Sequence, residues 1–343
     1  MSGSAPLRLL LDGSSLVANW RWLAAQAPGA ACGAAIKADG YGLGAAWVAE
    51  TLAAAGCRDF FVATWAEAAA LAPLGLPSLS VFHGVRDEDM APALSGIATP
   101  VLNTAKQAAR WRGAGGGACH VMLDTGMNRL GLGESDLAAG ALDGLAIDTL
   151  MSHLASADED SPQSSEQRAR FIAMADKVAA RRLSLANSAG IALGPDYAFD
   201  LTRPGLALYG GVPRPELAGV ISQVTFPEAQ VLQRRTVGAG EAVGYNATWT
   251  APTDTEVAIL NYGYADGYFR GFSGRGAALL GDAALPLLGR VSMDLVAIDV
   301  TGHDVAEGDW LAIDFDLPRA AAQSGMSQYE LLTGMGSRFD RIG

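Results

Sequence analysis

Residues 33–63 read GAAIKADGYGLGAAWVAETLAAAGCRDFFVA. A short apolar run at 33–37 is followed by a glycine-rich turn, a helix-like stretch at 45–56 and a second apolar run at 59–63. This order predicts a strand, a helix and another strand, which is the unit that builds parallel sheets covered by helices. We therefore expect an α/β architecture around this stretch.

The same alternation recurs on both sides of it. Further strands are expected at 7–11, 78–82, 98–101, 119–123, 147–152, 183–186 and 199–202, and further helices at 87–96, 103–112 and 164–182. Asp87 and Asn103 are the expected N-caps of two of these helices. Without the first strand, about eight strand–helix units remain, which favours a (β/α)8 TIM-like barrel over an open doubly wound sheet.

The pattern changes after about residue 215. Strand-like runs at 220–237, 256–264, 277–281, 284–301 and 309–315 are broken by Gly, Pro and Asp, which is typical of an all-β domain. The expected domains are a barrel over 1–215 and a C-terminal β domain over 216–343. The first strand, at 7–11, stands outside the eight units and can pair with the β domain.

Composition excludes several classes of protein. The chain has 343 residues, with 24 basic and 36 acidic side chains, and this net charge of −12 disfavours a nucleic-acid partner. No run of about 18 residues is both uncharged and rich in large apolar side chains, so no membrane span is expected. Three cysteines without a CxxC pair, and four histidines without HExxH, indicate neither a disulfide framework nor a metal site. We expect a soluble cytoplasmic protein.

Lysine is scarce, which restricts any lysine chemistry to Lys37, Lys106 and Lys177. The last two lie in helix-like stretches among other charged residues, where a solvated side chain is the usual outcome. Lys37 instead ends an apolar run, and ligands bind at the carboxyl ends of parallel strands. Partial burial there would lower the pKa of the amine and make it a nucleophile toward carbonyl groups. A plain salt bridge to a neighbouring carboxylate is the alternative.

Common nucleotide and hydrolase motifs are missing. Gly40, Gly42 and Gly44 give GxGxG rather than GxGxxG, and neither GxxxxGK nor GxSxG occurs. A dinucleotide site, a P-loop and a serine hydrolase are therefore disfavoured.

Eight strings occur in order between about residues 33 and 340: IKADGYGLGA, LDTGMNRLG, SHLASAD, ANSAG, TRPGLALYG, VGYNATW, GYADGY and GRVSMDLVAID. Together they resemble the alanine racemase family. The resemblance implies an isomerase that interconverts L- and D-alanine for peptidoglycan synthesis. It also implies the cofactor pyridoxal 5′-phosphate (PLP), held on a barrel that is followed by a β domain, and a homodimer with shared active sites.

The resemblance also assigns roles to residues. Lys37 matches the lysine that carries PLP and acts as the base on one face of the substrate Cα, and Tyr245 matches the base that the partner subunit provides on the other face. Arg203 matches the arginine at the pyridine nitrogen, and His153 a histidine that stacks near the ring and hydrogen-bonds Arg203. The remaining matches are, for the phosphate, Tyr41, Asn187, Ser188, Gly205, Leu206 and Tyr329, and, for the substrate region and entrance, Arg129, Met293, Asp294 and Tyr264.

Three positions depart from the family pattern. Met122 stands where some members carry a carbamylated lysine that supports the arginine matched by Arg129. Asn246 follows Tyr245 where Gly is common, and the segment MSQYELL around Tyr329 matches only loosely.

Three rival functions remain. A PLP-dependent decarboxylase would need a C-terminal acid–base cysteine, but the last cysteine is Cys119. A non-catalytic PLP-binding barrel would lack the β domain with Tyr245, Met293 and Asp294. A racemase of broader specificity, for serine as an example, is the nearest alternative, and we expect Tyr329 beside the substrate methyl group to favour alanine.

Overall fold

The computed structural model describes residues 5–343, which divide into two compact units. The barrel unit comprises Ser14–Ser222, and the β unit joins the residues up to Gly13 to Gln223–Gly343. The division falls after the boundary expected near residue 215, because the segment up to Ser222 stays bound to the first helix. The Asn19 amide donates to Leu208 O and Ser222 O, and its oxygen accepts from Ser222 N.

Seven parallel strands of the barrel unit, β3 to β9, lie side by side in chain order. The ring closes through β10, which pairs in parallel with β2, while Asp200 N, directly before β10, donates a hydrogen bond to Leu183 O of β9. Within residues 14–222, β2 and β3 thus share one of eight barrel positions. The strands are β2 Ala31–Cys32, β3 Ala34–Ala35, β4 Asp59–Val62, β5 Ser78–Val81, β6 Thr99–Leu102, β7 Cys119–Met122, β8 Ile147–Met151, β9 Arg182–Ser184 and β10 Leu201–Thr202.

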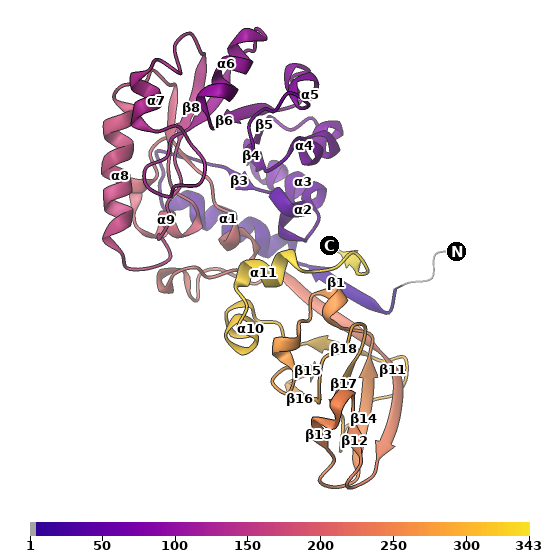
Figure 1. Ribbon diagram of the computed structural model, residues 1–343. Helices are drawn as coiled ribbons and strands as arrows, with labels where there is room; N and C mark the ends of the chain where they lie inside the picture. The colour runs from indigo at the N-terminus through magenta and orange to yellow at the C-terminus, as the bar shows by residue number, and fades with distance from the viewer. Residues whose placement is uncertain (1–4) are drawn as a thin grey trace. The chain divides into compact units, whose positions relative to one another are not determined.

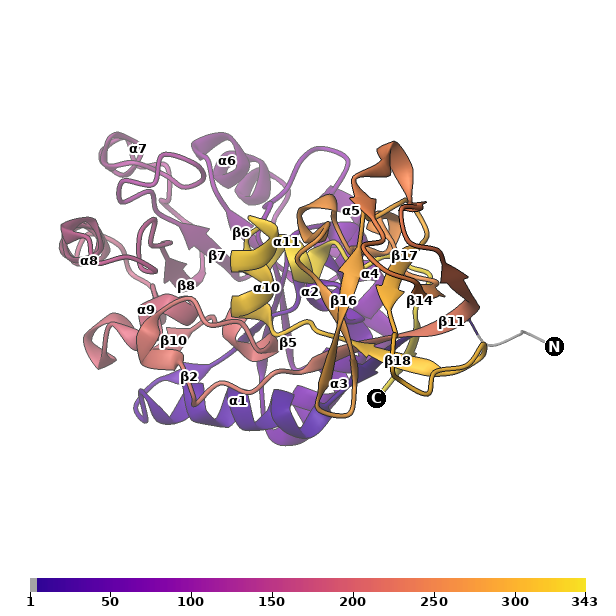
Figure 2. The same ribbon diagram turned by 90° about the horizontal axis from the view of Figure 1, so that it is seen from below.

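Helices cover the outside of this ring, as α6, α7 and α8 do for β6, β7 and β8 (Figures 1 and 2). The barrel interior is filled by buried apolar side chains, among them Phe61, Val101, Met122, Met151 and Leu201. The helices are α1 Gly13–Ala25, α2 Lys37–Tyr41, α3 Ala45–Ala55, α4 Trp65–Leu71, α5 Met90–Leu94, α6 Ala105–Gly113, α7 Glu134–Ala138, α8 Pro162–Ala175 and α9 Ser188–Ala192.

The two expected N-caps are wrong. Thr104 caps α6 by accepting a hydrogen bond from Gln107 N, whereas the buried Asn103 donates its side-chain amide to Phe82 O and Val101 O. Asp89 precedes α5, and Asp87 pairs with Arg110 instead. Both polar side chains found tertiary partners that a local pattern does not reveal.

The β unit is built on a mostly antiparallel sheet in the order β14-β17-β16-β15-β18-β11-β1-β19. The long strand β11 also pairs with β14, which closes the six strands from β14 to β11 into a barrel, and β1 pairs with β11 antiparallel. The strands are β1 Leu7–Leu11, β11 Thr225–Val237, β12 Ala242–Val243, β13 Trp249–Thr250, β14 Thr255–Leu260, β15 Ala277–Leu280, β16 Ala283–Leu288, β17 Val296–Asp299, β18 Trp310–Ile313 and β19 Asp340–Ile342.

Two helices, α10 (Leu317–Ser324) and α11 (Gln328–Thr333), also belong to the β unit, although the sequence pattern indicated strands alone. Across residues 5–343, no helix has the length and apolar character to span a bilayer. The same residues contain no cluster of three or more His, Cys, Asp or Glu side chains that is suited to hold a metal ion.

Candidate active site

A cavity of about 290 Å³ opens at the carboxyl end of the barrel strands. Its walls come from the residues that follow β3, β4, β5, β7 and β8, as expected for a barrel whose loops carry function. Three residues singled out in the sequence lie in it together. The lining is Lys37, Ala63, Phe82, His83, Met122, Leu123, Asp124, Met127, Arg129, Leu130, Ser152 and His153.

Lys37 follows β3 and is half-buried, whereas Lys106 and Lys177 are exposed. Burial lowers the pKa of the Lys37 amine, and the positive charge of Arg129 lowers it further. A larger share of this amine is therefore neutral at a given pH than for an exposed lysine. Neutral amines are the nucleophilic form toward carbonyl groups.

Arg203 directly follows β10 and is almost fully buried, with 4% of its surface exposed. Its guanidinium donates to Ser184 Oγ and to Ser152 O, the latter at 2.6 Å. Burial lowers the pKa of Arg203 to about 10, so the side chain remains protonated at neutral pH. It can donate a hydrogen bond to a ring nitrogen without giving up its proton.

His153 lies in the same cavity as Lys37 and Arg129. Burial, together with the charges of Arg203, Arg129 and Lys37, lowers the pKa of His153 to about 3, so its ring is neutral. The expected hydrogen bond to Arg203 is not among those formed within residues 5–343, because Arg203 is held by Ser184 and Ser152. A neutral ring facing a cavity can stack against a flat ligand.

A second group of predicted residues surrounds the start of α9. Asn187 caps this helix by accepting a hydrogen bond from Gly190 N. Ser188 Oγ accepts from Gly205 N at 3.0 Å and from Ala207 N at 3.1 Å, joining α9 to the turn after β10. That turn continues into a 3-10 helix, Leu206–Tyr209, whose first residue is buried.

Tyr41 links this group to the turn that follows Lys37. Its ring stacks on Tyr209 with centroids 4.6 Å apart, and a Cβ added at Gly205 would overlap its hydroxyl. Glycine is thus required at position 205 for steric reasons.

Arg129 is exposed, and within residues 5–343 its guanidinium forms no hydrogen bond or ion pair. Met122 gives it no polar support, since that side chain packs among Phe61, Val101 and Met151 in the barrel interior. The position of the carbamylated lysine is therefore apolar here. The guanidinium remains open to a carboxylate ligand.

The other predicted residues lie in the β unit. Tyr264 stacks under the Arg270 guanidinium, 5.3 Å from the ring centroid, and its amide donates to Ser292 O. Asp294 forms an ion pair with Arg338 at 2.7 Å. Met293 is 54% exposed, and Tyr329 on α11 is 43% exposed.

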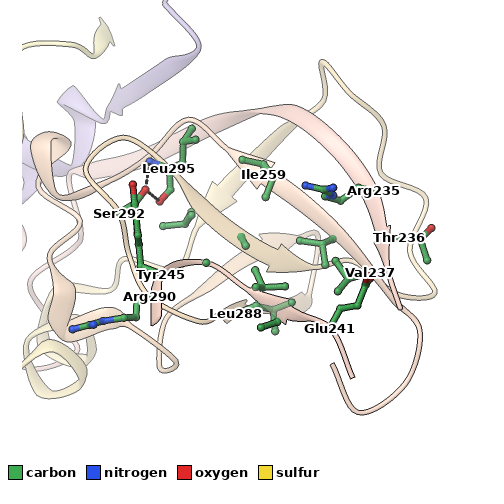
Figure 3. A pocket seen from close by; sticks show the side chains of 16 residues that line it. Arg235, Thr236, Val237, Glu241, Tyr245, Ile259, Leu288, Arg290, Ser292 and Leu295 are labelled. Atoms are coloured by element: carbon green, nitrogen blue, oxygen red, sulfur yellow. Dashed lines mark hydrogen bonds between the residues drawn. The ribbon is translucent and has the colours of Figure 1, made fainter. Parts of the chain in front are cut away.

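Tyr245 is the most exposed of these side chains, at 69%. It borders a cavity of about 550 Å³ in the β unit, where Arg290 and Ser292 lie near it and Val237, Leu288 and Glu241 line the cavity further along (Figure 3). The backbone is left-handed at the two following residues, Asn246 (φ 64°) and Ala247 (φ 47°). Asn tolerates this conformation better than most residues, which accounts for its presence where Gly is common.

Sequence reasoning missed several residues that hold the site in place. Ser152 and Ser184 bind Arg203, and Arg338 joins Asp294 to the buried Asp266. Ser152 and Asp266 lie within the quoted strings SHLASAD and GYADGY but were assigned no role, and Ser184 and Arg338 stand outside all eight strings. The TxxE spacing of Thr64 and Glu67 is a recognisable capping box, but it does not reveal that Glu67 also reaches Ala38 N.

Comparisons with known proteins agree with this geometry. Residues 11–213 match the family model of the alanine racemase N-terminal domain, and residues 224–343 match that of the C-terminal domain. A curated alanine racemase of Acidiphilium cryptum is 43% identical over 97% of this chain and 98% of its own length. One from Methylobacterium nodulans is 44% identical over 97% and 95%.

A solved structure extends the agreement to three dimensions. The crystal structure of alanine racemase from Bartonella henselae, with covalently bound pyridoxal phosphate, superposes with a TM-score of 0.91 at 32% identity and 99% coverage of both chains. Both halves of the chain, its full-length relatives and its fold therefore point to one conclusion. The chain belongs to the alanine racemase family.

Proposed function

We propose that this protein is a PLP-dependent alanine racemase. The observation that carries the proposal is the meeting of half-buried Lys37 with Arg129 and His153 in one cavity at the carboxyl end of the barrel. Membership of the alanine racemase family supports the substrate and the cofactor.

The residues present suit PLP, which is a flat pyridine ring with an aldehyde and a phosphate. The neutral ring of His153 and the protonated Arg203 match an aromatic ring with an acceptor nitrogen. The missing side chain at Gly205 lets the Tyr41 hydroxyl approach the turn near the start of α9, where hydroxyl and backbone N–H groups suit a phosphate. We propose that Lys37 binds PLP covalently. The phosphate contacts would come from Tyr41, Asn187, Ser188, Gly205, Leu206 and Tyr329.

Racemisation requires removal of the Cα proton on one face and its return on the other. PLP, when bound, supplies the electron sink that makes this proton acidic. We propose that the Lys37 amine exchanges the proton on one face and the partner subunit's Tyr245 on the other. Arg203, which keeps its own proton, would limit the electron withdrawal of the pyridine ring and so restrict side reactions.

We propose a homodimer in which each site draws residues from both subunits. The high exposure of Tyr245 and Met293 supports this proposal, because aromatic and Met side chains are enriched at protein interfaces relative to the rest of the surface. Arg129, with its open guanidinium, would bind the substrate carboxylate, and Met293, Asp294 and Tyr264 would border it. We also propose a cytoplasmic location, which the free thiols of Cys32, Cys57 and Cys119 support.

Incubation of the purified protein with each L-amino acid, followed by chiral chromatography, tests the activity. D-alanine should form fastest, and equal turnover of serine would instead favour the broader racemase. Borohydride reduction followed by peptide mapping tests the site: PLP should be fixed to Lys37. A label on Lys106 or Lys177 would overturn the assignment of Lys37, and a bound cofactor without any turnover would favour a non-catalytic PLP-binding protein.

A further inference from the structure

The short segment α2, which begins at Lys37, is a left-handed turn rather than a right-handed helix. Ala38, Asp39, Gly40 and Tyr41 have φ values of 53°, 53°, 62° and 56°, so four successive residues are left-handed. Three of them are not glycine, and the Cβ of such residues makes the left-handed form unfavourable relative to the right-handed form. Contacts elsewhere in the fold must therefore hold the turn in place.

One of these contacts comes from Glu67. It is the third residue of α4, and its Oε2 accepts a hydrogen bond from Thr64 N at 2.9 Å, as in an ordinary capping box. The same oxygen also accepts from Ala63 N at 2.8 Å. Its other oxygen, Oε1, accepts from Ala38 N at 2.7 Å, 29 residues away along the chain. One carboxylate thus binds the backbone at Ala63 and directly after Lys37, and both Ala63 and Lys37 line the cavity.

The far side of the turn has its own contact. Asp39 Oδ1 accepts from Ala45 N at 2.8 Å, and Gly44 N donates to Asp39 O at 2.9 Å. These bonds join the turn to the start of α3. The bond from Ala38 N to Glu67 joins the turn, directly after Lys37, to α4.

We propose that Glu67 is a positioning residue for Lys37: its carboxylate holds the left-handed turn and so places the lysine amine at the carboxyl end of β3. Its negative charge also acts on the amine directly. Glu67 raises the pKa of Lys37, against the lowering by burial and by Arg129. The other titratable or charged groups that line the cavity are His83, Asp124, Arg129 and His153. The inference rests on the proposed function for its catalytic consequence, but not for its effect on the amine.

The scarcity of lysine allows a direct test. The full-length chain, freed of PLP with hydroxylamine, is labelled with acetic anhydride over a range of pH, and the labelling of each lysine is measured by peptide mass spectrometry. Lys106 and Lys177, both exposed, are internal standards in the same chain. In Glu67→Gln, the labelling midpoint of Lys37 should move to lower pH while the midpoints of the two standards stay unchanged. An unchanged Lys37 midpoint would overturn the proposal.

Two further variants separate the charge of Glu67 from the length of its side chain and from a general loosening of α4. Glu67→Asp keeps the charge but shortens the side chain, so its Lys37 midpoint should lie above that of Glu67→Gln. Thr64→Ala removes the other half of the same capping box, which loosens the start of α4, and leaves the carboxylate intact. It should leave the Lys37 midpoint in place. A shift in Thr64→Ala equal to that in Glu67→Gln would mean that loosening of α4, rather than Glu67, acts on Lys37.

Catalysis provides a separate measurement. With PLP restored, Glu67→Gln should lower kcat for alanine by roughly 10- to 100-fold, because small misplacements of a reacting group have effects of this size. Thr64→Ala should retain kcat within about threefold, as expected for a variant that keeps the carboxylate. If borohydride fixes PLP to another lysine, the proposed function fails, yet the labelling of Lys37 still decides the inference about Glu67.

Discussion

The hydrogen atom that serves as the side chain of Gly205 illustrates how a single residue shapes this site. A methyl group there would overlap the Tyr41 hydroxyl. Tyr41 cannot easily retreat, because its ring stacks on Tyr209, whose own hydroxyl donates to Ala35 O at 2.8 Å. The turn after β10 and the turn after β3 therefore pack closely against each other where Gly205 meets Tyr41.

Gly205→Ala should weaken PLP binding by roughly 5- to 150-fold, because overpacking of a close contact costs about 1–3 kcal/mol. Binding is measured by titrating the PLP-free protein and following the absorbance of the lysine-bound cofactor. Gly113→Ala, which meets no atom within 4 Å, is the matched control in the same unit and should bind PLP normally. Normal affinity in Gly205→Ala would remove this position from the phosphate site.

Tyr245→Phe removes only the phenolic oxygen from an exposed side chain. We expect PLP absorbance to persist and racemisation to fall by roughly 10²- to 10⁴-fold, the usual contribution of a general acid–base group. Since the enantiomers are equally stable, kcat/KM must fall equally in both directions. The asymmetry should appear in deuterium oxide: the enantiomer whose Cα proton faces Lys37 continues to exchange it, and the other does not. Equal exchange from both enantiomers would contradict a two-base scheme.

At the scale of elements, the barrel strands carry different chemistry at their two ends. At the amino end, Arg182 of β9 binds Asp59 of β4 at 2.9 Å and Asp148 of β8 at 3.1 Å. His120 of β7 accepts from Thr149 N at 3.2 Å and contacts Ser80 Oγ at 3.1 Å. This polar layer joins strands that are distant in sequence, and it lies at the opposite end from Lys37.

The layer makes stability depend on pH. Burial lowers the pKa of His120 from 6.5 to about 4. Between pH 6.5 and pH 4, this side chain is therefore protonated in the unfolded chain but neutral in the folded chain. Stability therefore falls as pH decreases from 6.5 to 4. His120→Asn should reduce this slope by about 1.4 kcal/mol per pH unit, the equivalent of one proton. Urea unfolding measured at several pH values gives the pH dependence of the free energy of unfolding. If His120→Asn leaves this dependence unchanged, His120 has the same pKa in the folded and unfolded chain.

The helices and strands also show which features can be predicted from neighbouring residues alone. The barrel strands were predicted within a few residues, because a fully buried parallel strand is a short apolar run between turn residues. The N-caps of α5 and α6 were wrong, because Asp87 and Asn103 bind groups brought near by folding. The helix expected over 164–182 ends at Ala175, before the strand that Arg182 begins.

At the scale of the whole molecule, shared sites can be tested by mixing two inactive variants. Lys37→Ala and Tyr245→Phe each lack one proposed base. In an equal mixture of subunits, half of the dimers are heterodimers, and each has one site with both bases and one with neither. Co-expression should therefore restore about a quarter of the wild-type activity, as expected for a closed twofold dimer. Native mass spectrometry counts the heterodimers, and heterodimers without activity would refute the sharing of Lys37 and Tyr245 between subunits.

The amino-acid sequence alone predicted the barrel and several residues of the candidate active site. The alternation of apolar runs and helical stretches predicted the barrel, and the position of Lys37 at the end of a run singled it out among three lysines. Both signals are local, because periodicity and strand ends are properties of neighbouring residues. Family strings extended the prediction to Arg203, His153 and Ser188.

Other features depend on residues that only folding brings together. Ser184 and Ser152 hold Arg203, and Glu67 reaches the turn after Lys37. A hydrogen bond between residues far apart in the chain leaves no periodic trace in the sequence, since either partner alone is an ordinary serine or glutamate. The chemistry of the site could therefore be predicted from residue types and their order. The groups that position its residues were identified only in the tertiary structure.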